Sequence, residues 1–415
     1  MRVKRHLAVL VALVSVGLVA GALGALPANA DPPNIRRDGG VHYIRGGGSD
    51  TTYEMMVGLA DQYNATPGCI TSQSGFTFPE NGTCIDFDPV TPGIQPHWED
   101  PVIQAGANPD HNIIWQFYPY GSSNGIKVLT DTGQPNVTER FRFARSSRAP
   151  SGSDPAGLRF VGYARDAIPW VKYDDSAVAT EPSDGVTNLT QAQLQGIFTG
   201  CTNTNWNQVG GNNGPIIVWS AQNGSGTRAT FDGFVGGDST TCIPANQKDG
   251  NTANGERVVF ENQSTNIFNS STLDCETSPG VGPTGPCTGN SIFFYSRGRF
   301  NEAPPVSGTI SGVLGNINGV APTDANISSG AYLYSRTVFN VIRNAFASDN
   351  ANGAVRSYFD GDGWLCASNL PNNPKTGVNY RTELENIIKA QGFVPFPVGA
   401  QGGGFPNGFC RITDT

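Results

Sequence analysis

The chain has 415 residues, of which 26 are Lys or Arg and 34 are Asp or Glu, giving a formal net charge of −8. This acidic balance, without a basic run beyond the N-terminus, argues against nucleic acid and anionic membranes as partners. A chain of this length exceeds one compact core and predicts two lobes.

Residues 1–30 have the features of a cleavable secretory signal peptide. The basic start MRVKRH precedes an apolar run, and Ala28-Asn29-Ala30 offers a small-residue cleavage site. A retained membrane anchor is the alternative for an apolar run of this length. Cleavage would leave 23 basic and 34 acidic residues, a net charge of −11. Because the first cysteine is Cys69, no lipid anchor is indicated, and we expect a secreted, extracellular protein without membrane insertion.

The chain contains 8 cysteines, an even number that favours disulfides in a secreted protein. Eight cysteines allow 105 connectivities, among which the sequence does not choose. Neither C-x-x-C spacing nor a histidine cluster is present, so we expect no metal and no cofactor. Spacing suggests four local pairs: Cys69 with Cys84, Cys201 with Cys242, Cys275 with Cys287, and Cys366 with Cys410.

The N-terminal part of the mature chain twice follows an apolar strand with a turn rich in glycine and serine. Residues 41–64 predict a strand, a glycine turn and a helix that Ser49, Asp50 or Thr51 can cap. The apolar run 112–120 predicts a second strand that enters the turn GSSNG, after which a helix can begin.

The rest of the chain continues to alternate strands and helices. Thr190 and Gln193 form a capping-box pair at the start of the helix predicted for 189–200. This alternation predicts an α/β protein with largely parallel sheets. Strands are predicted for 141–150, 160–173 and 290–296, a strand, turn and helix for 215–237, and amphipathic helices for 331–346 and 381–393.

The turn GSSNG also matches the nucleophile motif G-x-S-x-G, with Ser123 as the nucleophile. An α/β-hydrolase places its general-base histidine after the nucleophile, whereas all four histidines precede Ser123. Triads with other chain orders exist, but His97 and His111 lie in polar loop sequence without a catalytic signature. We therefore expect no catalytic residue, and a secreted phosphatase stays as the enzymatic alternative.

Three turns share one design, namely GGGSDTT (46–52), GSSNG (121–125) and NGSGTR (223–228), and SSRAP adds a fourth serine turn. Each of the three follows an apolar strand and opens a predicted helix, so it offers free N–H groups, a positive helix end and hydroxyl donors. In open α/β sheets such junctions lie at the carboxyl ends of strands, where ligands bind. The turns therefore predict an anion-binding cleft, the alternative being purely structural turns.

The order of these motifs resembles that of the phosphate-type (PstS-like) solute-binding proteins of ABC importers. The resemblance covers nearly all of the mature chain and rests on GGGSDTT, YGSSNGI, FARSSRAP, LTQAQLQGIFTG with WNQVGG, NGSGTRATF, GVLGNINGVAPT and AQGFVPFP. It implies a two-lobed type II periplasmic-binding-protein (Venus flytrap) fold with two hinge crossings. Lobe one would combine residues 41–145 with 300–415, and lobe two would comprise 146–299.

The resemblance also implies a ligand and its contacts. The ligand would be an oxyanion, phosphate first, bound by a monomer that serves an ABC permease. A scavenger or adhesin module with another ligand is the alternative. The implied contacts are Thr51 (or Asp50, because the register is uncertain by one residue), Ser122, Ser147, Ser225, Gly226 and Thr227, with Gly224 admitting close backbone approach.

Two positions depart from the family pattern. Arg148 stands where the family usually has Asp, and Ala221 where it usually has Arg. Arg148 offers donors only, so we expect a site that does not require a proton on its ligand. Either Arg148 or Arg228 could supply the positive fork that Ala221 cannot.

Overall fold

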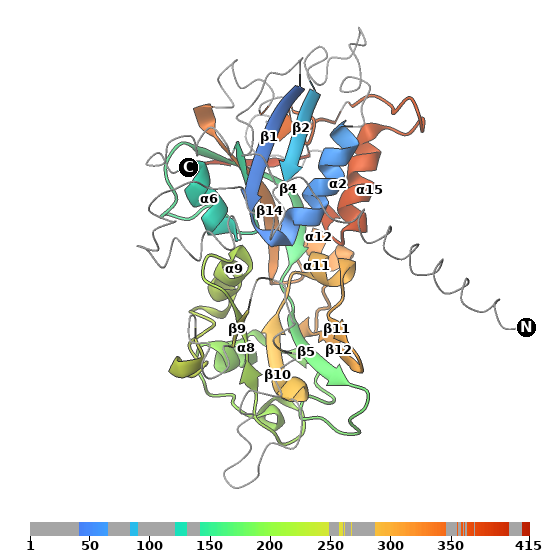
Figure 1. The fold of residues 1–415 in the computed structure, drawn as a ribbon. Coiled ribbons are helices and arrows are strands. Elements are labelled where there is room, and N and C mark those ends of the chain that lie inside the picture. Colours follow the sequence, from blue (N-terminus) through green and yellow to red (C-terminus); the bar gives the residue numbers. More distant parts are fainter. Residues whose placement is uncertain are drawn as a thin grey trace, which may run out of the picture.

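The chain folds into two lobes, each with its own sheet and hydrophobic core (Figure 1). The computed structural model describes residues 41–64, 84–89, 121–130, 142–248, 257–259, 261, 267, 287–345, 355, 358–359, 361, 363–368, 370–397 and 409–415. The predicted signal peptide and the strand predicted for 112–120 lie outside these residues. Within them, no helix is both long and apolar enough to cross a bilayer.

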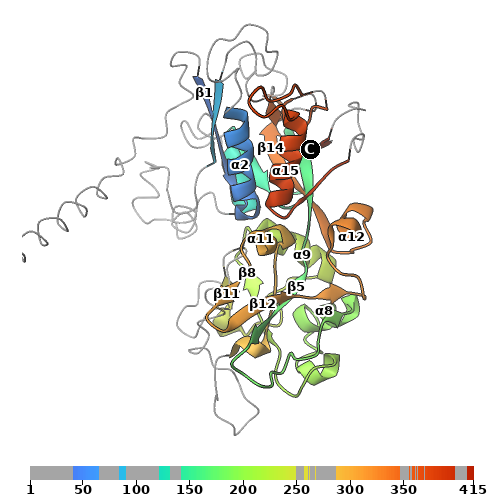
Figure 2. The ribbon, with the colours of Figure 1, turned by 90° about the vertical axis from the view of Figure 1, so that its right-hand side faces the viewer.

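The first sheet has seven strands in the order β15-β4-β14-β3-β1-β2, with β16 also pairing with β4. Helices α2 and α15 lie side by side over this sheet (Figure 2). Met56, Leu59, Ala60 and Tyr63 of α2 are buried at helical spacing, which explains why this segment packs as an amphipathic helix. The elements are β1 (Val41–Gly48), η1 (Asp50–Thr52), α2 (Tyr53–Asn64), β2 (Cys84–Pro89), α6 (Ser122–Thr130), β3 (Phe143–Ser146), β4 (Leu158–Ala167), β14 (Ser335–Arg343), α15 (Tyr380–Ala390), β15 (Val394–Pro395) and β16 (Arg411–Asp414).

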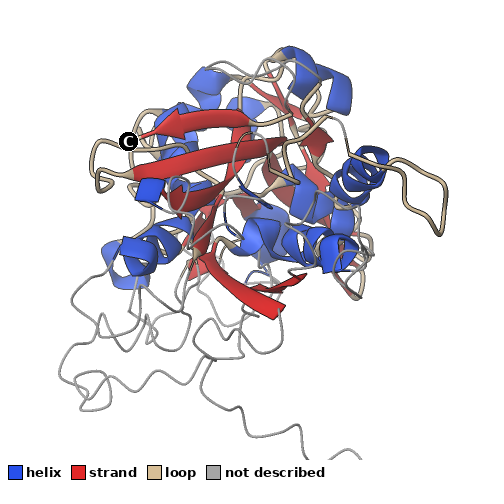
Figure 3. Cartoon of the chain, turned by 90° about the horizontal axis from the view of Figure 1, so that it is seen from above, coloured by secondary structure: helices blue, strands red, loops and turns tan. Residues whose placement is uncertain are grey.

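The second lobe is built on a five-stranded sheet in the order β11-β12-β5-β10-β7. Seen from above, the two lobes overlap, and helices surround the strands of the molecule (Figure 3). In its core, Phe231 of α9 stacks on Phe294 of β10, with ring centroids 4.2 Å apart. The elements are β5 (Trp170–Asp175), β6 (Asn188–Leu189), α8 (Gln191–Phe198), η3 (Trp206–Val209), β7 (Ile217–Val218), β8 (Ser220–Ala221), α9 (Gly226–Val235), η4 (Ala245–Gln247), β9 (Val258–Val259), η7 (Cys287–Asn290), β10 (Ser291–Phe294), α11 (Arg297–Glu302), β11 (Val306–Ser307), β12 (Ile310–Leu314), β13 (Asn316–Ile317) and α12 (Asp324–Ser329).

The chain passes between the lobes next to β4 and β14. Strand β4 belongs to the first sheet and β5 to the second, and the crossing at Ile168 lies against the returning segment, because Ile168 N donates to Tyr334 O at 2.8 Å. The first core extends to Ala164 and resumes at Val338, and the second fills the interval between them. We therefore propose lobe boundaries close to these two strands, whereas the sequence placed them at 145/146 and 299/300.

Three expectations about secondary structure were wrong. The single strand predicted for 160–173 is two strands, β4 in the first sheet and β5 in the second, on either side of the crossing between the lobes. Antiparallel pairings predominate among the described strands, because β14 runs antiparallel to both β3 and β4, and β5 runs antiparallel to β10 and β12. The segment 331–346 was expected to be a helix, but most of it forms the strand β14. That strand is central and buried on both faces, so its sequence lacks the alternation that distinguishes a half-buried strand from a helix.

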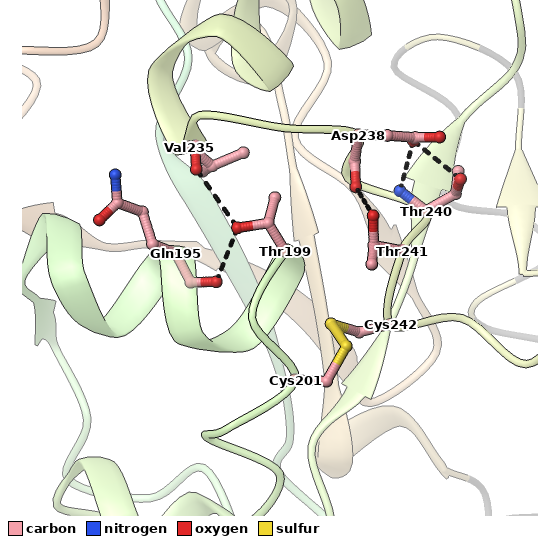
Figure 4. Close-up of a disulfide and its surroundings, with 8 residues drawn as sticks. All are labelled: Gln195, Thr199, Cys201, Val235, Asp238, Thr240, Thr241 and Cys242. Carbon is pink, nitrogen blue, oxygen red and sulfur yellow. Dashed lines mark hydrogen bonds between the residues drawn. A yellow bond between two sulfur atoms is a disulfide. The ribbon is translucent and has the colours of Figure 1, made fainter.

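The structure confirms two of the four predicted disulfides. Cys201–Cys242 joins the segments that follow α8 and α9 (Figure 4), and Cys366–Cys410 joins the chain just before β16 to the first core. The pairings of Cys69 with Cys84 and of Cys275 with Cys287 involve side chains outside the described part of the chain.

Candidate functional site

The serine and threonine turns meet in space. Ser49 caps η1 directly after β1, Ser122 opens α6, Ser147 follows β3, and Thr227 is the second residue of α9. We call these four residues and Thr51 the hydroxyl cluster. Its oxygens lie close together: Ser49 Oγ is 2.9 Å from Ser147 Oγ, Ser122 Oγ is 3.2 Å from Ser147 Oγ, and Thr51 Oγ1 is 3.2 Å from Thr227 Oγ1.

The hydroxyl cluster lies between the lobes and is buried. The helix α6 packs in the first core through Ile126 and Leu129, while α9 packs in the second through Phe231 and Val235. Every member of the cluster is at most 2% exposed. Segments separated by up to 176 residues in the sequence therefore present their hydroxyl groups to one interlobe site.

Glycine permits this close approach of the turns. A Cβ atom added at Gly226 would lie 2.0 Å from Ser122 Oγ and 2.6 Å from Ser147 Oγ. At Gly121, where φ is +93°, an added Cβ would lie 2.6 Å from Gly224 O. Any side chain at either position would separate the turn of α9 from that of α6.

A carboxylate, that of Glu261, is bound at the centre of the hydroxyl cluster. Its Oε1 accepts hydrogen bonds from Thr227 N at 2.8 Å, from Ser147 Oγ at 3.0 Å and from Thr227 Oγ1. Its Oε2 lies 3.2 Å from Ser49 Oγ. Glu261 is fully buried, and the N–H of Thr227 belongs to the first turn of α9, where the helix dipole favours negative charge.

Asp50 is the second carboxyl group of the site. Burial and the negative charge of Glu261 raise the pKa of Asp50 well above its usual value. Burial would also raise the pKa of Glu261, but the hydrogen bond to Asp50, the charge of Arg336 and the bonds from Thr227 outweigh it and lower that pKa. The pair therefore carries one negative charge on Glu261, with the proton on Asp50.

Two buried arginines supply positive charge beside these carboxyl groups. Arg145, in β3, is 1% exposed, and its Nε donates to Ser49 O at 2.9 Å. Burial lowers the pKa of Arg145 to about 10, against the raising influence of nearby acidic groups. Arg336 donates to Ser147 O at 2.8 Å and forms a buried ion pair with Asp166.

The other predicted ligand residues have different placements. Arg148 forms a bidentate ion pair with Asp154, with N–O distances of 2.8 and 2.7 Å. Arg228 donates to Ala221 O and forms an ion pair with Asp238. The described contacts of both guanidinium groups are therefore with residues outside the hydroxyl cluster. Ser225 is 2% exposed, and its Oγ accepts from Arg228 N as the cap of α9. These contacts do not favour the predicted role of the two arginines as the positive fork.

Sequence reasoning missed four residues of this site. Ser49 was assigned only as a possible helix cap, Arg145 lies three residues before Arg148, and Arg336 lies in a segment expected to be a helix. Glu261 lies in the polar stretch FENQSTN, which matches no motif. The high density of serines around Arg145 was the one available signal for that residue.

Comparisons with known proteins place the chain in a family. Residues 91–360, more than half of the chain, match the PBP superfamily domain. The fold is similar to that of an ABC-type phosphate transport receptor from Vibrio cholerae (20% identity, TM-score 0.46, 85% of this chain and 99% of that one). It is also similar to PstS from Borrelia burgdorferi (18% identity, TM-score 0.38, 85% and 98%).

A further similarity is to OxyR from Corynebacterium glutamicum, at 8% identity, with a TM-score of 0.38 over 93% of this chain and 73% of that one. Because these TM-scores are below 0.5, the similarities to individual structures carry no weight for the ligand. The domain match does carry weight for membership: the chain belongs to the PBP superfamily.

Proposed function

We propose that the chain is a secreted solute-binding protein that captures an oxyanion, most favourably phosphate, between its lobes and delivers it to an ABC-type permease. The observation that carries this proposal is the bound carboxylate of Glu261. A carboxylate is itself an oxyanion, and it is held by hydroxyl groups of both lobes and by the first turn of a helix. The same donors suit an oxygen of phosphate.

Asp50 places a protonated carboxyl group beside the hydroxyl cluster. Its raised pKa keeps the proton on this group, so it can donate a hydrogen bond to an anion oxygen and does not repel sulfate. An ionised carboxylate would accept from protonated phosphate and repel sulfate, and the sequence suggested that this discrimination was lost with the replacement of the family's Asp by Arg148. Asp50 does not restore it.

Binding without catalysis agrees with the contacts of Ser123, the residue that matched the nucleophile motif. Its Oγ accepts a hydrogen bond from Arg148 Nε at 3.1 Å, and its N donates to Gly224 O at 3.2 Å. We therefore propose that Ser122, and not Ser123, serves the site.

Calorimetric titration of the purified mature protein with phosphate, sulfate and molybdate tests the proposal. We expect saturable binding of phosphate. An absence of binding to any of these anions, or hydrolysis of a phosphate ester by the same sample, would overturn it.

A further inference from the structure

The carboxylate of Glu261 uses the donors that an external anion would need. Its Oε1 accepts three hydrogen bonds, from Thr227 N, Thr227 Oγ1 and Ser147 Oγ. Three donors around one oxygen are a full set for a charged acceptor, and no second oxygen fits the same position. A phosphate oxygen can therefore bind these donors only after Glu261 has left.

We propose that Glu261 is a tethered internal ligand of the oxyanion site, which phosphate must displace in order to bind. This inference rests on the proposed function and adds a mechanism that sets the apparent affinity of the site. Displacement exchanges one anion for another, so the charge of the buried site is conserved. A neutral ligand would leave the buried cations uncompensated and would not release Glu261.

The charged groups around Glu261 agree with such an exchange. Arg336 is the cation whose charge lowers the pKa of Glu261, while Arg299 and Arg145 act on its partner Asp50. The charge of Glu261 in turn raises the pKa of the buried Arg145. An incoming anion takes over this balance, and burial keeps the exchange little affected by salt.

The apparent Kd for phosphate equals the intrinsic Kd divided by the fraction of molecules in which Glu261 has left the site. If Glu261 is released in about one molecule in ten, the apparent Kd is about tenfold above the intrinsic Kd. Removal of the carboxylate should recover this factor. An ordinary ligand-contacting residue would behave in the opposite way, since its removal weakens binding.

The test compares wild type with Glu261→Ala and the isosteric Glu261→Gln by calorimetry with inorganic phosphate at pH 7. Glu181→Gln is the control, because it replaces a buried carboxyl group of the second lobe that accepts from Asp175 N outside the hydroxyl cluster. We expect Glu261→Ala to lower the Kd by about tenfold, Glu261→Gln to lower it less, and the control to match wild type. Equal or weaker binding in both Glu261 variants would overturn the inference and leave the proposed function intact.

A second measurement does not depend on phosphate. The backbone amide proton of Thr227 should resonate further downfield in the ligand-free wild type than in Glu261→Gln, because a carboxylate is the stronger acceptor. If no variant binds phosphate, the proposed function fails, and this amide shift alone decides whether Glu261 occupies the site. Identical Thr227 shifts in the two proteins would overturn the occupancy.

Discussion

Replacement of Gly226 by Ala should prevent the turn of α9 from closing on the hydroxyl cluster. The added Cβ would lie 2.0 Å from Ser122 Oγ, whereas ordinary contacts begin at 3.4 Å, so one side has to move by about 1.4 Å. Ser122 cannot easily rotate away, because its Oγ accepts from Ser147 N at 2.9 Å. We therefore expect the lobes to separate at this point.

The magnitude follows from the bonds that this separation breaks. Hydrogen bonds to a charged group contribute about 1.5–3 kcal/mol each. Loss of two of these donors, Ser147 Oγ and Thr227 N, would thus cost about 3–6 kcal/mol, which corresponds to a loss of phosphate affinity of about 10²- to 10⁴-fold. Calorimetry with phosphate measures this loss directly.

Gly233→Ala is the matched control on the same helix. Its added Cβ meets nothing within 4 Å, and the residue is exposed. Because Ala is the better helix former, this variant should gain up to about 1 kcal/mol of stability and keep its phosphate affinity. A Gly226→Ala protein that binds phosphate within about threefold of wild type would refute the steric argument.

Three further outcomes are expected. Thr227→Val removes a hydroxyl donor of the site and should weaken phosphate binding by about 10- to 150-fold. The control Thr199→Val removes a hydroxyl that bonds backbone carbonyls in the second lobe (Figure 4) and should keep the wild-type Kd. Equal Kd values for the two variants in calorimetry would contradict this expectation. Arg148→Ala should leave phosphate affinity unchanged. Burial acts to raise the pKa of Asp154, but its bonds to Arg148 prevail and lower it, so the ion pair stabilises the fold above about pH 4 and stabilises it less as the pH falls. Urea unfolding should show a lower unfolding free energy for Arg148→Ala than for wild type at pH 7, and the difference should shrink by pH 3. A difference of the same size at both pH values would exclude the ion pair as its cause. Cys201→Ser opens a disulfide that closes a span of 41 residues and should cost about 4 kcal/mol of unfolding free energy, and an unchanged thermal midpoint would contradict that estimate.

The sequence was most informative where local chemistry determines local structure. The capping box of Thr190 and Gln193 begins α8 as predicted, and the turn around Ser225 opens α9 as predicted. Strand β14 was mistaken for a helix because tertiary burial on both faces, and not local periodicity, makes it a strand. The direction of strand pairing likewise depends on crossings between lobes that a local pattern does not encode.

The site was predictable to the same extent. Turns that expose helix N–H groups and hydroxyls carry their chemistry in the local sequence, so the turns themselves could be singled out. The individual contacts Thr51, Ser122, Ser147 and Thr227 were implied by the family resemblance, and their role in binding stays a prediction. The partners of Arg148 are set by the tertiary position of Asp154, and the carboxylate of Glu261 reaches the site from a stretch without a motif. Neither contact has a local signature.

The most direct test of the account is a crystal structure of the wild-type protein grown with saturating phosphate at neutral pH. The account predicts a phosphate oxygen within hydrogen-bond distance of Thr227 N and Ser147 Oγ, and Glu261 withdrawn from both. A structure in which Glu261 keeps these two donors while phosphate is absent or bound elsewhere would contradict the central claim that this cluster of turns is an exchangeable oxyanion site.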